Sequence, residues 1–380
     1  MLLPANRIHA IDALRGFALL GILWVNIYVF NAPYAHYSVF YGAFEGVNSS
    51  LVFFSSSFVA GKFMFIFAFL FGYGAQLQSQ KISDLGLFTN YWNRRMFVLA
   101  VFGLAHLIFF WFGDILLPYA ILGFLIPYLL RFNPRKLFII GLGLYLSSAF
   151  AVLIVKLFEL PDPGIASEMK LDAFIRLYSS SSYMELLPYR LEEFWSLRNE
   201  KLVFYLPKEL ALFCFGIAAG KLKLIESYLP KTPYLLLGFS MAILWYLYRG
   251  EYFALYQPDE NPLLIPVLIV QNIVFEIVLG AVYIFGFIHL CRLRVGVYLI
   301  RIFSPVGRMS LTNYFFQSLV CVVLFYGFGF GLYGSLNPME LLYISVIIFF
   351  IQTLLSHVWL SRLRQGPLEL CWRILAGKKQ

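Results

Sequence analysis

Apolar runs of about 20 residues recur along the whole chain, and this repetition restricts the possible folds more than any other feature. Of the 380 residues, 61% are hydrophobic and only 13% are charged. Soluble domains contain roughly 25% charged and 45–50% apolar residues, so a soluble core could not bury this much apolar surface. The sequence therefore predicts an all-α, polytopic transmembrane helical bundle.

The basic residues between the apolar runs predict how the chain crosses the membrane. If successive connecting segments alternate between the two sides, 19 of the 29 Lys and Arg residues fall on one side. The positive-inside rule makes that side the cytoplasm, and it places both termini there. About ten spans are predicted, near residues 11–31, 51–75, 96–112, 115–131, 137–158, 209–222, 233–249, 263–290, 311–331 and 339–360.

The chain, 1–380, is interpreted as a single integral membrane domain, since no stretch has the composition of a separate soluble unit. Its longest predicted external loop covers residues 159–208. Parts of this loop mix apolar and charged residues at helical spacing, for example LDAFIRLY and LEEFWSLRNEKLVFYL. We expect interfacial amphipathic helices here, either as simple surface helices or as a lid over an external cavity.

The formal net charge of +9 does not indicate a nucleic-acid partner, because the basic residues are spread over many loops and form no continuous stripe. The five histidines lie in separate regions and form no metal-binding motif, and the sequence has no phosphate loop or dinucleotide fingerprint. We therefore expect no metal and no bound cofactor. The partner that composition itself indicates is the lipid bilayer.

Ionisable residues inside the predicted spans are the main candidates for function, because each costs roughly 2.5–3.5 kcal/mol to insert at membrane depth. Asp12 and Arg15 are three residues apart in the first span and share a helix face. They could form a structural clamp or one wall of a substrate cavity. Lys62, in the second span, requires an acid or a cluster of carbonyls as its partner, and Asp114 and Glu276 are the candidate acids.

One stretch combines several such residues around the third span. Arg94 and Arg95 precede the span, His106 lies about three turns into it, and Asp114 follows a Trp-x-Gly-Asp turn. Histidine suits proton transfer near neutral pH. Eight residues of continuous helix would separate His106 from Asp114 by roughly 12 Å, so the two can meet only if the chain folds back or a substrate joins them. His106 is interpreted either as an acid/base group or as a hydrogen-bonded structural histidine.

A second polar feature opens the ninth span. Asn313 and Gln317 are four residues apart and form one polar face, which we expect to point into the bundle.

Five motifs, in order along the chain, resemble the YeiB family of bacterial polytopic inner-membrane proteins, also called domain of unknown function 418. They are IDALRGFALLGILWVNI, GKFMFIFAFLFGYG, HLIFFWFGDILLPYAILG, GRMSLTNYFFQSL and RQGPLELCWR. The resemblance covers nearly the whole chain. It implies a multi-pass protein of the bacterial cytoplasmic (inner) membrane, from a family without an established activity.

The D-x-x-R-G opening of the first span is also similar, more distantly, to membrane acyltransferases of the acyltransferase-3 type and to heparan-α-glucosaminide N-acetyltransferases. This similarity implies acyl transfer from a cytoplasmic donor to an acceptor across the membrane. Arg94 and Arg95 would then hold the phosphates of an acyl-CoA donor substrate, since arginine matches phosphate oxygens. His106 would be the acid/base group or the acyl carrier. Acyltransferase-3 proteins tend to have a histidine near the outer end of the first span, whereas this chain has Asn26 there.

Three functional hypotheses follow. The first is a transmembrane acyltransferase in which His106 and Asp114 are catalytic and Asp114 positions an external acceptor hydroxyl or amine. The second is a transporter with an intramembrane relay of Lys62, Asp114 and Glu276, and the third is a structural or assembly protein of the membrane. In the first hypothesis the substrate-binding residues are Arg94, Arg95, Asp12, Arg15, Lys62, Glu276, Asn313 and Gln317.

Overall fold

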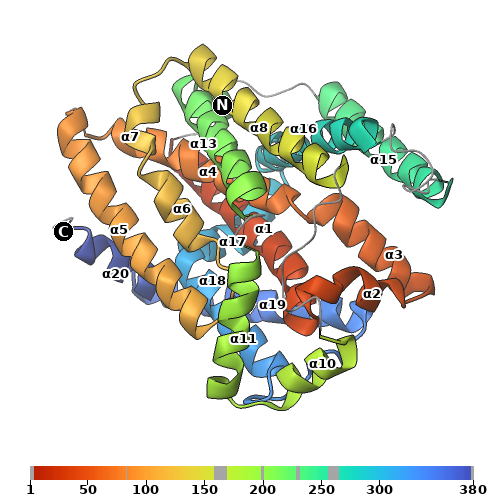
Figure 1. The fold of residues 1–380 in the computed structure, drawn as a ribbon. Helices are drawn as coiled ribbons and strands as arrows, with labels where there is room; N and C mark the ends of the chain where they lie inside the picture. The colour runs from red at the N-terminus through yellow and green to blue at the C-terminus, as the bar shows by residue number, and fades with distance from the viewer. Residues whose placement is uncertain are drawn as a thin grey trace.

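The computed structural model describes residues 4–82, 84–157, 169–197, 201–227, 232–255 and 265–377, and its regular elements are all helical (Figure 1). This confirms the all-α prediction. The elements are α1 (Pro4–Asn31), η1 (Tyr34–His36), α2 (Tyr37–Gly42), α3 (Gly46–Phe54), η2 (Ser55–Val59), α4 (Lys62–Ser79), α5 (Leu85–Phe109), α6 (Leu116–Gly123), α7 (Ile126–Leu129), α8 (Pro134–Leu157), α10 (Leu171–Ser180), α11 (Tyr183–Ser196), η3 (Lys201–Tyr205), α13 (Leu206–Lys221), α14 (Leu224–Ser227), α15 (Thr232–Leu255), α16 (Ile265–Leu290), α17 (Gly296–Arg308), α18 (Ser310–Phe325), α19 (Pro338–Arg362) and α20 (Pro367–Leu375).

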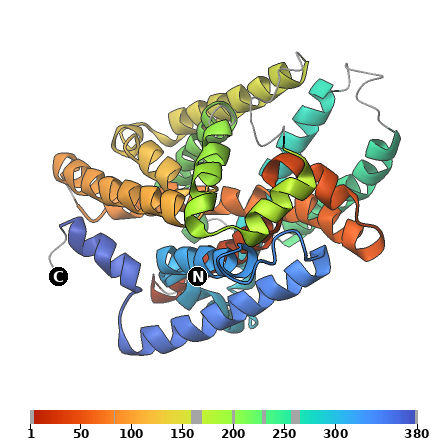
Figure 2. The ribbon, with the colours of Figure 1, turned by 60° about the horizontal axis from the view of Figure 1, so that its bottom comes forward.

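Two helices organise the bundle. α1 packs mainly against α17 and α4, while α13 packs against α4 and α8 (Figures 1 and 2). Small residues permit the closest of these approaches: a methyl group on Gly307 would overlap the Asp12 carbonyl, and one on Gly216 would overlap the Phe69 carbonyl. Close backbone approach at small residues is typical of helix association in membranes.

Large apolar side chains cover much of the outer surface, as expected for a protein embedded in a bilayer. Examples are Phe97 on α5, Phe138 and Phe150 on α8, and Phe350 on α19, each more than half exposed. A soluble protein rarely exposes apolar patches of this extent. The chain is therefore a helical membrane protein.

Six helical segments in the described ranges are long and apolar enough to cross a membrane, and a seventh is added if α17 and α18 form one span bent by 80°. Three of the ten predicted runs do not meet this criterion within the described residues. α5 begins at Leu85, earlier than predicted, and includes Arg94 and Arg95. The run 115–131 is divided into the short helices α6 and α7, and in α15 the apolar stretch within the described residues is Thr232–Trp245.

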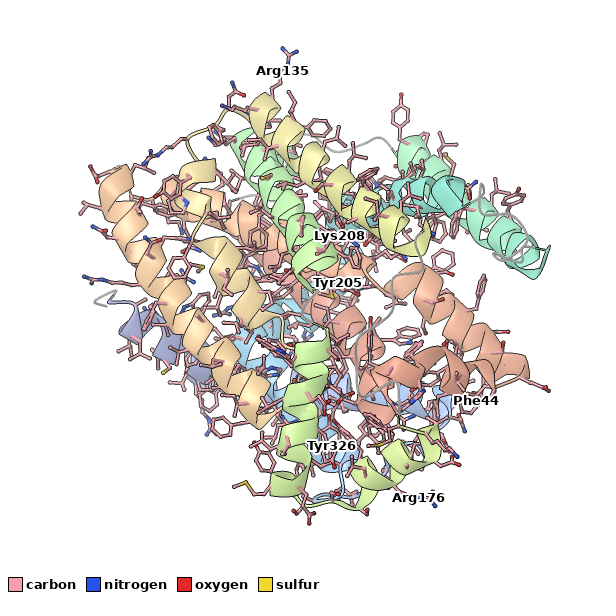
Figure 3. All side chains as sticks on the ribbon, in the orientation of Figure 1. Phe44, Arg135, Arg176, Tyr205, Lys208 and Tyr326 are labelled. Carbon is pink, nitrogen blue, oxygen red and sulfur yellow. The ribbon has the colours of Figure 1, made fainter. Side chains whose placement is uncertain are left out.

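The segment 159–208 contains α10, α11 and η3 where it is described. Figure 1 shows α10 and α11 at one end of the bundle, close to α2. Gly327 donates its backbone N–H to the Tyr178 carbonyl (2.8 Å), so α10 is bonded to the chain that follows α18. Figure 3 shows Tyr326 beside α11 at this end and Arg135 pointing away at the opposite end.

Candidate functional site

His106 and Asp114 meet because α5 stops one turn after the histidine. The His106 carbonyl accepts hydrogen bonds from the N–H groups of both Phe110 (2.8 Å) and Trp111 (3.0 Å), and the chain then folds back. This return places Asp114 Oδ1 3.0 Å from His106 Nδ1. The fold-back that the sequence required is therefore present, and the pair is joined directly.

The aspartate is fixed on its other side as well. Asp114 Oδ2 accepts a hydrogen bond from the Leu117 backbone N–H at the start of α6 (2.7 Å). A carboxylate at a helix N-terminus is stabilised by the unpaired N–H groups and the helix dipole. Asp114 is thus held as an acceptor that faces His106.

The second ring nitrogen of His106 contacts a residue that sequence reasoning missed. His106 Nε2 lies 2.8 Å from the Ser318 Oγ, on α18. His106 Nδ1 and Asp114 Oδ1 are in ion-pair contact, and in the tautomer that carries its proton on Nδ1 the lone pair of the neutral imidazole lies on Nε2, facing the Ser318 hydroxyl. Ser318, His106 and Asp114 therefore form a row of polar contacts, a hydrogen bond followed by an ion pair, in which the side chains of His106 and Asp114 are fully buried and Ser318 is 2% exposed.

Aromatic rings enclose this row. The His106 ring centroid is 4.8 Å from that of Tyr314 and 5.1 Å from that of Phe315, and the Phe110 ring stacks on it at 5.7 Å. A dry aromatic environment strengthens hydrogen bonds between the enclosed polar groups.

A large cavity approaches the row from one side. We call it the basic cavity; its volume is about 460 Å³. Its lining includes Ile115, Tyr119 and Tyr314, of which Ile115 directly follows Asp114 and Tyr314 packs against the His106 ring. Its charged lining consists of five basic and two acidic side chains: Arg15, Lys81, Arg95, Arg308, Arg373, Asp12 and Glu369.

Asp12 and Arg15 are paired with each other and also face the basic cavity. Their side chains form an ion pair of 3.0 Å within α1, and both line the basic cavity. The pair therefore joins two turns of α1 and also forms part of a cavity wall.

The neighbouring arginines of α5 have different environments. Arg95 lines the basic cavity, donates to Gln78 Oε1 and to the Tyr91 hydroxyl (3.3 Å), and lies 4.1 Å from the Trp372 ring centroid. Arg94 is exposed and does not contribute to the lining. Residues adjacent in a helix point about 100° apart, which explains the difference.

The C-terminal helix closes one side of the basic cavity. Trp372 of α20 donates its indole N–H to the Arg95 carbonyl (2.7 Å). Glu369 accepts from the backbone N–H groups of Leu311 (2.7 Å) and Thr312 (3.1 Å) at the start of α18. α20 is thus bonded to both α5 and α18.

A second, smaller cavity of about 170 Å³ lies on the other side of the Asp114 turn; we call it the apolar cavity. Its lining includes Asn26, Trp111, Asp114, Ile115 and Glu209. Ile115 lines both cavities, so the turn that holds Asp114 separates them. Asn26, which replaces the histidine of the acyltransferase-3 pattern, therefore faces the apolar cavity.

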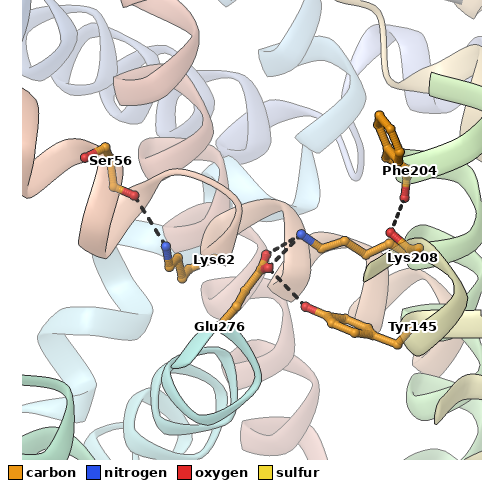
Figure 4. A network of polar contacts seen from close by, with 7 residues as sticks. Ser56, Lys62, Tyr145, Phe204, Lys208 and Glu276 are labelled. Atoms are coloured by element: carbon orange, nitrogen blue, oxygen red, sulfur yellow. Dashed lines mark hydrogen bonds and ion pairs between the residues drawn. The ribbon is translucent and has the colours of Figure 1, made fainter. Parts of the chain in front are cut away.

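Lys62 and Glu276 belong to a separate polar cluster, with two residues that sequence reasoning missed (Figure 4). Glu276 accepts from Lys208 Nζ (2.6 and 2.7 Å) and from the Tyr145 hydroxyl (3.0 Å). Lys62 donates to the Ser56 carbonyl (3.4 Å) and also interacts electrostatically with Glu276. Figure 3 shows Lys208 beside the first turn of α13, although the sequence placed it in the external loop.

Asn313 and Gln317 point into the bundle, and the structure gives them protein partners. Asn313 donates to the Val306 carbonyl and to Ser356 Oγ, both at 3.0 Å. Gln317 donates to Gln352 Oε1 (3.0 Å). These side chains connect α18 to α17 and α19, and neither lines the two cavities described above.

No group of three or more His, Cys, Asp or Glu side chains in the described ranges is arranged to hold a metal ion. The basic cavity is instead suited to an anionic ligand, because guanidinium groups pair well with phosphate or carboxylate oxygens.

These features define a multi-pass helical membrane protein with a buried polar row between a basic and an apolar cavity. Residues 225–379 match a family described as protein of unknown function (DUF418). The chain is 30% identical to the uncharacterized protein YeiB of Escherichia coli (strain K12), with 97% of this chain and 96% of YeiB covered. It is 27% identical to the uncharacterized protein YxaH of Bacillus subtilis (strain 168), with 98% and 94% covered.

The chain therefore belongs to the DUF418 family that includes YeiB, as its motifs predicted. No solved structure matches it significantly.

Proposed function

We propose that this protein is a transmembrane acyltransferase, which moves an acyl group from cytoplasmic acyl-CoA to a hydroxyl or amine acceptor on the external side. The observation that carries the proposal is that Ile115 lines both cavities and directly follows Asp114. Two substrates that enter from opposite sides would therefore approach the same His106–Asp114 pair, which is the geometry that transfer across a membrane requires.

The basic cavity is the proposed donor site. Arg15, Arg95 and Arg308 present guanidinium groups to one space, and Lys81 and Arg373 add positive charge. The phosphates of coenzyme A are bound well by such a set. The volume of about 460 Å³ also lies within the range of small-molecule sites.

The distribution of the lining residues supports the proposed orientation, with both termini in the cytoplasm. Lys81, Arg308 and Arg373 of the basic cavity are on the side that the positive-inside rule assigns to the cytoplasm. The apolar cavity is lined by Tyr34 and Tyr205, from segments assigned to the outside. In this proposal α5, the α6–α7 segment and α15 complete ten crossings of the bacterial inner membrane.

The proposed chemistry uses His106 as the proton carrier. Asp114 holds Nδ1–H and stabilises the imidazolium that forms when Nε2 takes a proton. The aromatic enclosure excludes water that would otherwise hydrolyse the acyl donor.

Ligand-induced thermal stabilisation tests the donor site. Acetyl-CoA, a longer acyl-CoA or free coenzyme A at about 100 times the dissociation constant should stabilise the purified protein by about 2.7 kcal/mol and raise the melting temperature. Arg308→Gln should reduce this increase, because Arg308 lines the basic cavity, whereas Arg94→Gln should keep it. No increase with any coenzyme A species, or an equal loss in both variants, would refute the donor site.

Transport is the second candidate function, and the cluster of Figure 4 is the observation that favours it. Lys208, Glu276 and Lys62 place several ionisable groups within the bundle, as proton-coupled carriers do. Asp114 is in ion-pair contact with His106, so a relay would have to use the cluster without it. This candidate predicts that Glu276→Gln stops proton-coupled uptake while His106→Ala has no effect.

A further inference from the structure

We propose that Ser318 is the nucleophile of this site and carries the acyl group as a serine ester between donor and acceptor. This inference rests on the proposed function. Its starting point is that His106 Nε2 lies 2.8 Å from Ser318 Oγ, so that, in the tautomer with its proton on Nδ1 beside Asp114, the single lone pair of the neutral imidazole faces the Ser318 hydroxyl. The proton that His106 is placed to remove is therefore that of Ser318 rather than that of an external acceptor.

The arrangement has the order and contacts of a nucleophile–base–orienter row. Asp114 lies 3.0 Å from Nδ1 and is itself fixed by the Leu117 N–H, so the imidazole is held with Nε2 toward Ser318. The Ser318 hydroxyl is also 3.3 Å from the Tyr314 carbonyl, a second acceptor one turn earlier in α18. Rows of this kind are recognised by geometry and role, not by sequence position or fold.

Ser318 lies one helical turn beyond the lining of the basic cavity. Tyr314, four residues earlier, is on the same face of α18, lines that cavity and packs against the His106 ring. Movement of this one aromatic side chain would open the basic cavity to Ser318. Tyr314 is therefore the group that separates donor and nucleophile.

A buried donor in the same cavity is suited to the reacting carbonyl. Tyr119 lines the basic cavity and is only 1% exposed. Its hydroxyl has no hydrogen-bond partner among the residues that the structure describes. A phenol O–H in this position can donate to a thioester carbonyl oxygen, which becomes more negative as the nucleophile adds.

The proposed reaction has two balanced steps. In the first, Ser318 Oγ attacks the thioester carbonyl carbon, its proton passes to His106 Nε2, and the C–S bond breaks as that proton is given to the coenzyme A sulfur. In the second, the acceptor oxygen or nitrogen attacks the serine ester, its proton passes to Nε2, and the C–Oγ bond breaks as Ser318 regains the proton. No oxidant or reductant takes part.

Labelling by a fluorophosphonate, followed by peptide mass spectrometry, tests the nucleophile without reference to the donor. We expect modification of Ser318, lost in Ser318→Ala and slowed about 10²–10⁴-fold in His106→Ala, the usual contribution of a general base. Ser345→Ala is the matched control, because Ser345 is equally buried but donates only to the Leu342 carbonyl.

Tyr314→Ala should accelerate labelling by opening the path. Absence of Ser318 labelling in both the wild type and Tyr314→Ala would overturn the inference.

Incubation with labelled acetyl-CoA, without an acceptor, then separates this inference from the proposed function. We expect one coenzyme A thiol released per protein and an acetyl group on Ser318. In Ser318→Cys the acetyl group should form a thioester, which neutral hydroxylamine cleaves much faster than the wild-type ester. If Ser318→Ala retains the full transfer rate, the inference fails while acyl transfer stands. If fluorophosphonate labels Ser318 but no acyl-CoA does, the nucleophile stands and the donor assignment fails.

Discussion

At the scale of single residues, the site depends on where α5 ends. His106 and Asp114 are eight residues apart, and a longer helix would hold them out of reach. Because the chain folds back after Phe109, His106 Nδ1 and Asp114 Oδ1 lie 3.0 Å apart. The same turn places Ile115 between the two cavities. Ser318 then contributes from a helix more than 200 residues later in the chain.

Asp114→Asn is the sharpest single substitution at this scale. The asparagine keeps the size of the side chain but offers an N–H to Nδ1, which favours the tautomer with the proton on Nε2. His106 then cannot accept the Ser318 proton. Release of coenzyme A thiol from acyl-CoA should fall by at least about 100-fold, measured by thiol assay in detergent.

Asp84→Asn is the control for Asp114→Asn. Asp84 caps α5 by accepting from the Leu87 N–H, and asparagine caps helices about as well as aspartate. This variant should therefore retain thiol release. Full activity in Asp114→Asn would show that the His106–Asp114 pair is a structural contact only.

At the scale of elements, the crossing of α1 and α17 positions the basic cavity. Asp12 and Arg15 of α1 and Arg308 of α17 all line it, so the separation of the two helices sets its shape. Gly16 and Gly307 allow the backbones to touch at this crossing.

Gly307→Ala should therefore destabilise the protein. The added methyl would overlap the Asp12 carbonyl, and overpacking of this kind costs about 1–3 kcal/mol. Gly143→Ala on α8 is the matched control, because no atom lies within 4 Å of the added methyl. That variant should be neutral or more stable by about 0.5–1 kcal/mol. Equal melting temperatures for the two variants would contradict the close crossing.

The α10–α11 segment should make stability depend on pH through Glu193. Burial raises the pKa of this carboxyl from 4.5 to about 8, although the Tyr178 hydroxyl and Arg190 favour its charged form. At a pH between these two pKa values, Glu193 keeps its proton in the folded state and has lost it in the unfolded state. Stability should therefore decrease as the pH rises from about 5 to about 8. Glu193→Gln should reduce this decrease in melting temperature.

Glu185→Gln on the same helix is the control for Glu193. Hydrogen bonds from Ser182 lower the pKa of the exposed Glu185 below its ordinary value, so it is charged in both states above pH 5. Its substitution should shift the melting temperature equally across that range. A Glu193→Gln protein with the wild-type pH dependence would contradict the assignment.

At the scale of the whole molecule, the sequence predicts the class and the polar residues better than it predicts their contacts. The length of the apolar runs and the apolar composition identify a helical membrane protein, because a helix must be apolar over about 20 residues to cross the bilayer. The partners could not be predicted in the same way. Lys208 joins Glu276, and Ser318 joins His106, through helix packing between segments far apart in the chain.

Local features explain the remaining differences. Arg94 and Arg95 are equivalent as sequence, yet helix geometry turns only Arg95 into the basic cavity. Ser318 looks like an ordinary small residue beside Gln317, and only the position of α18 against α5 gives it a role. The span count also depends on breaks, such as the 80° bend between α17 and α18, that hydropathy does not show.

In the proposed mechanism the basic cavity accepts acyl-CoA from the cytoplasmic side and delivers it to His106. Coenzyme A thiol release from externally added acetyl-CoA and longer acyl-CoAs should be measured in sealed bacterial membrane vesicles of both orientations. If the donor enters from the cytoplasm, we expect release in inverted vesicles, little in right-side-out vesicles, and loss of the inverted-vesicle signal in His106→Ala. Equal release in both orientations, or a signal that His106→Ala leaves unchanged, would contradict this mechanism.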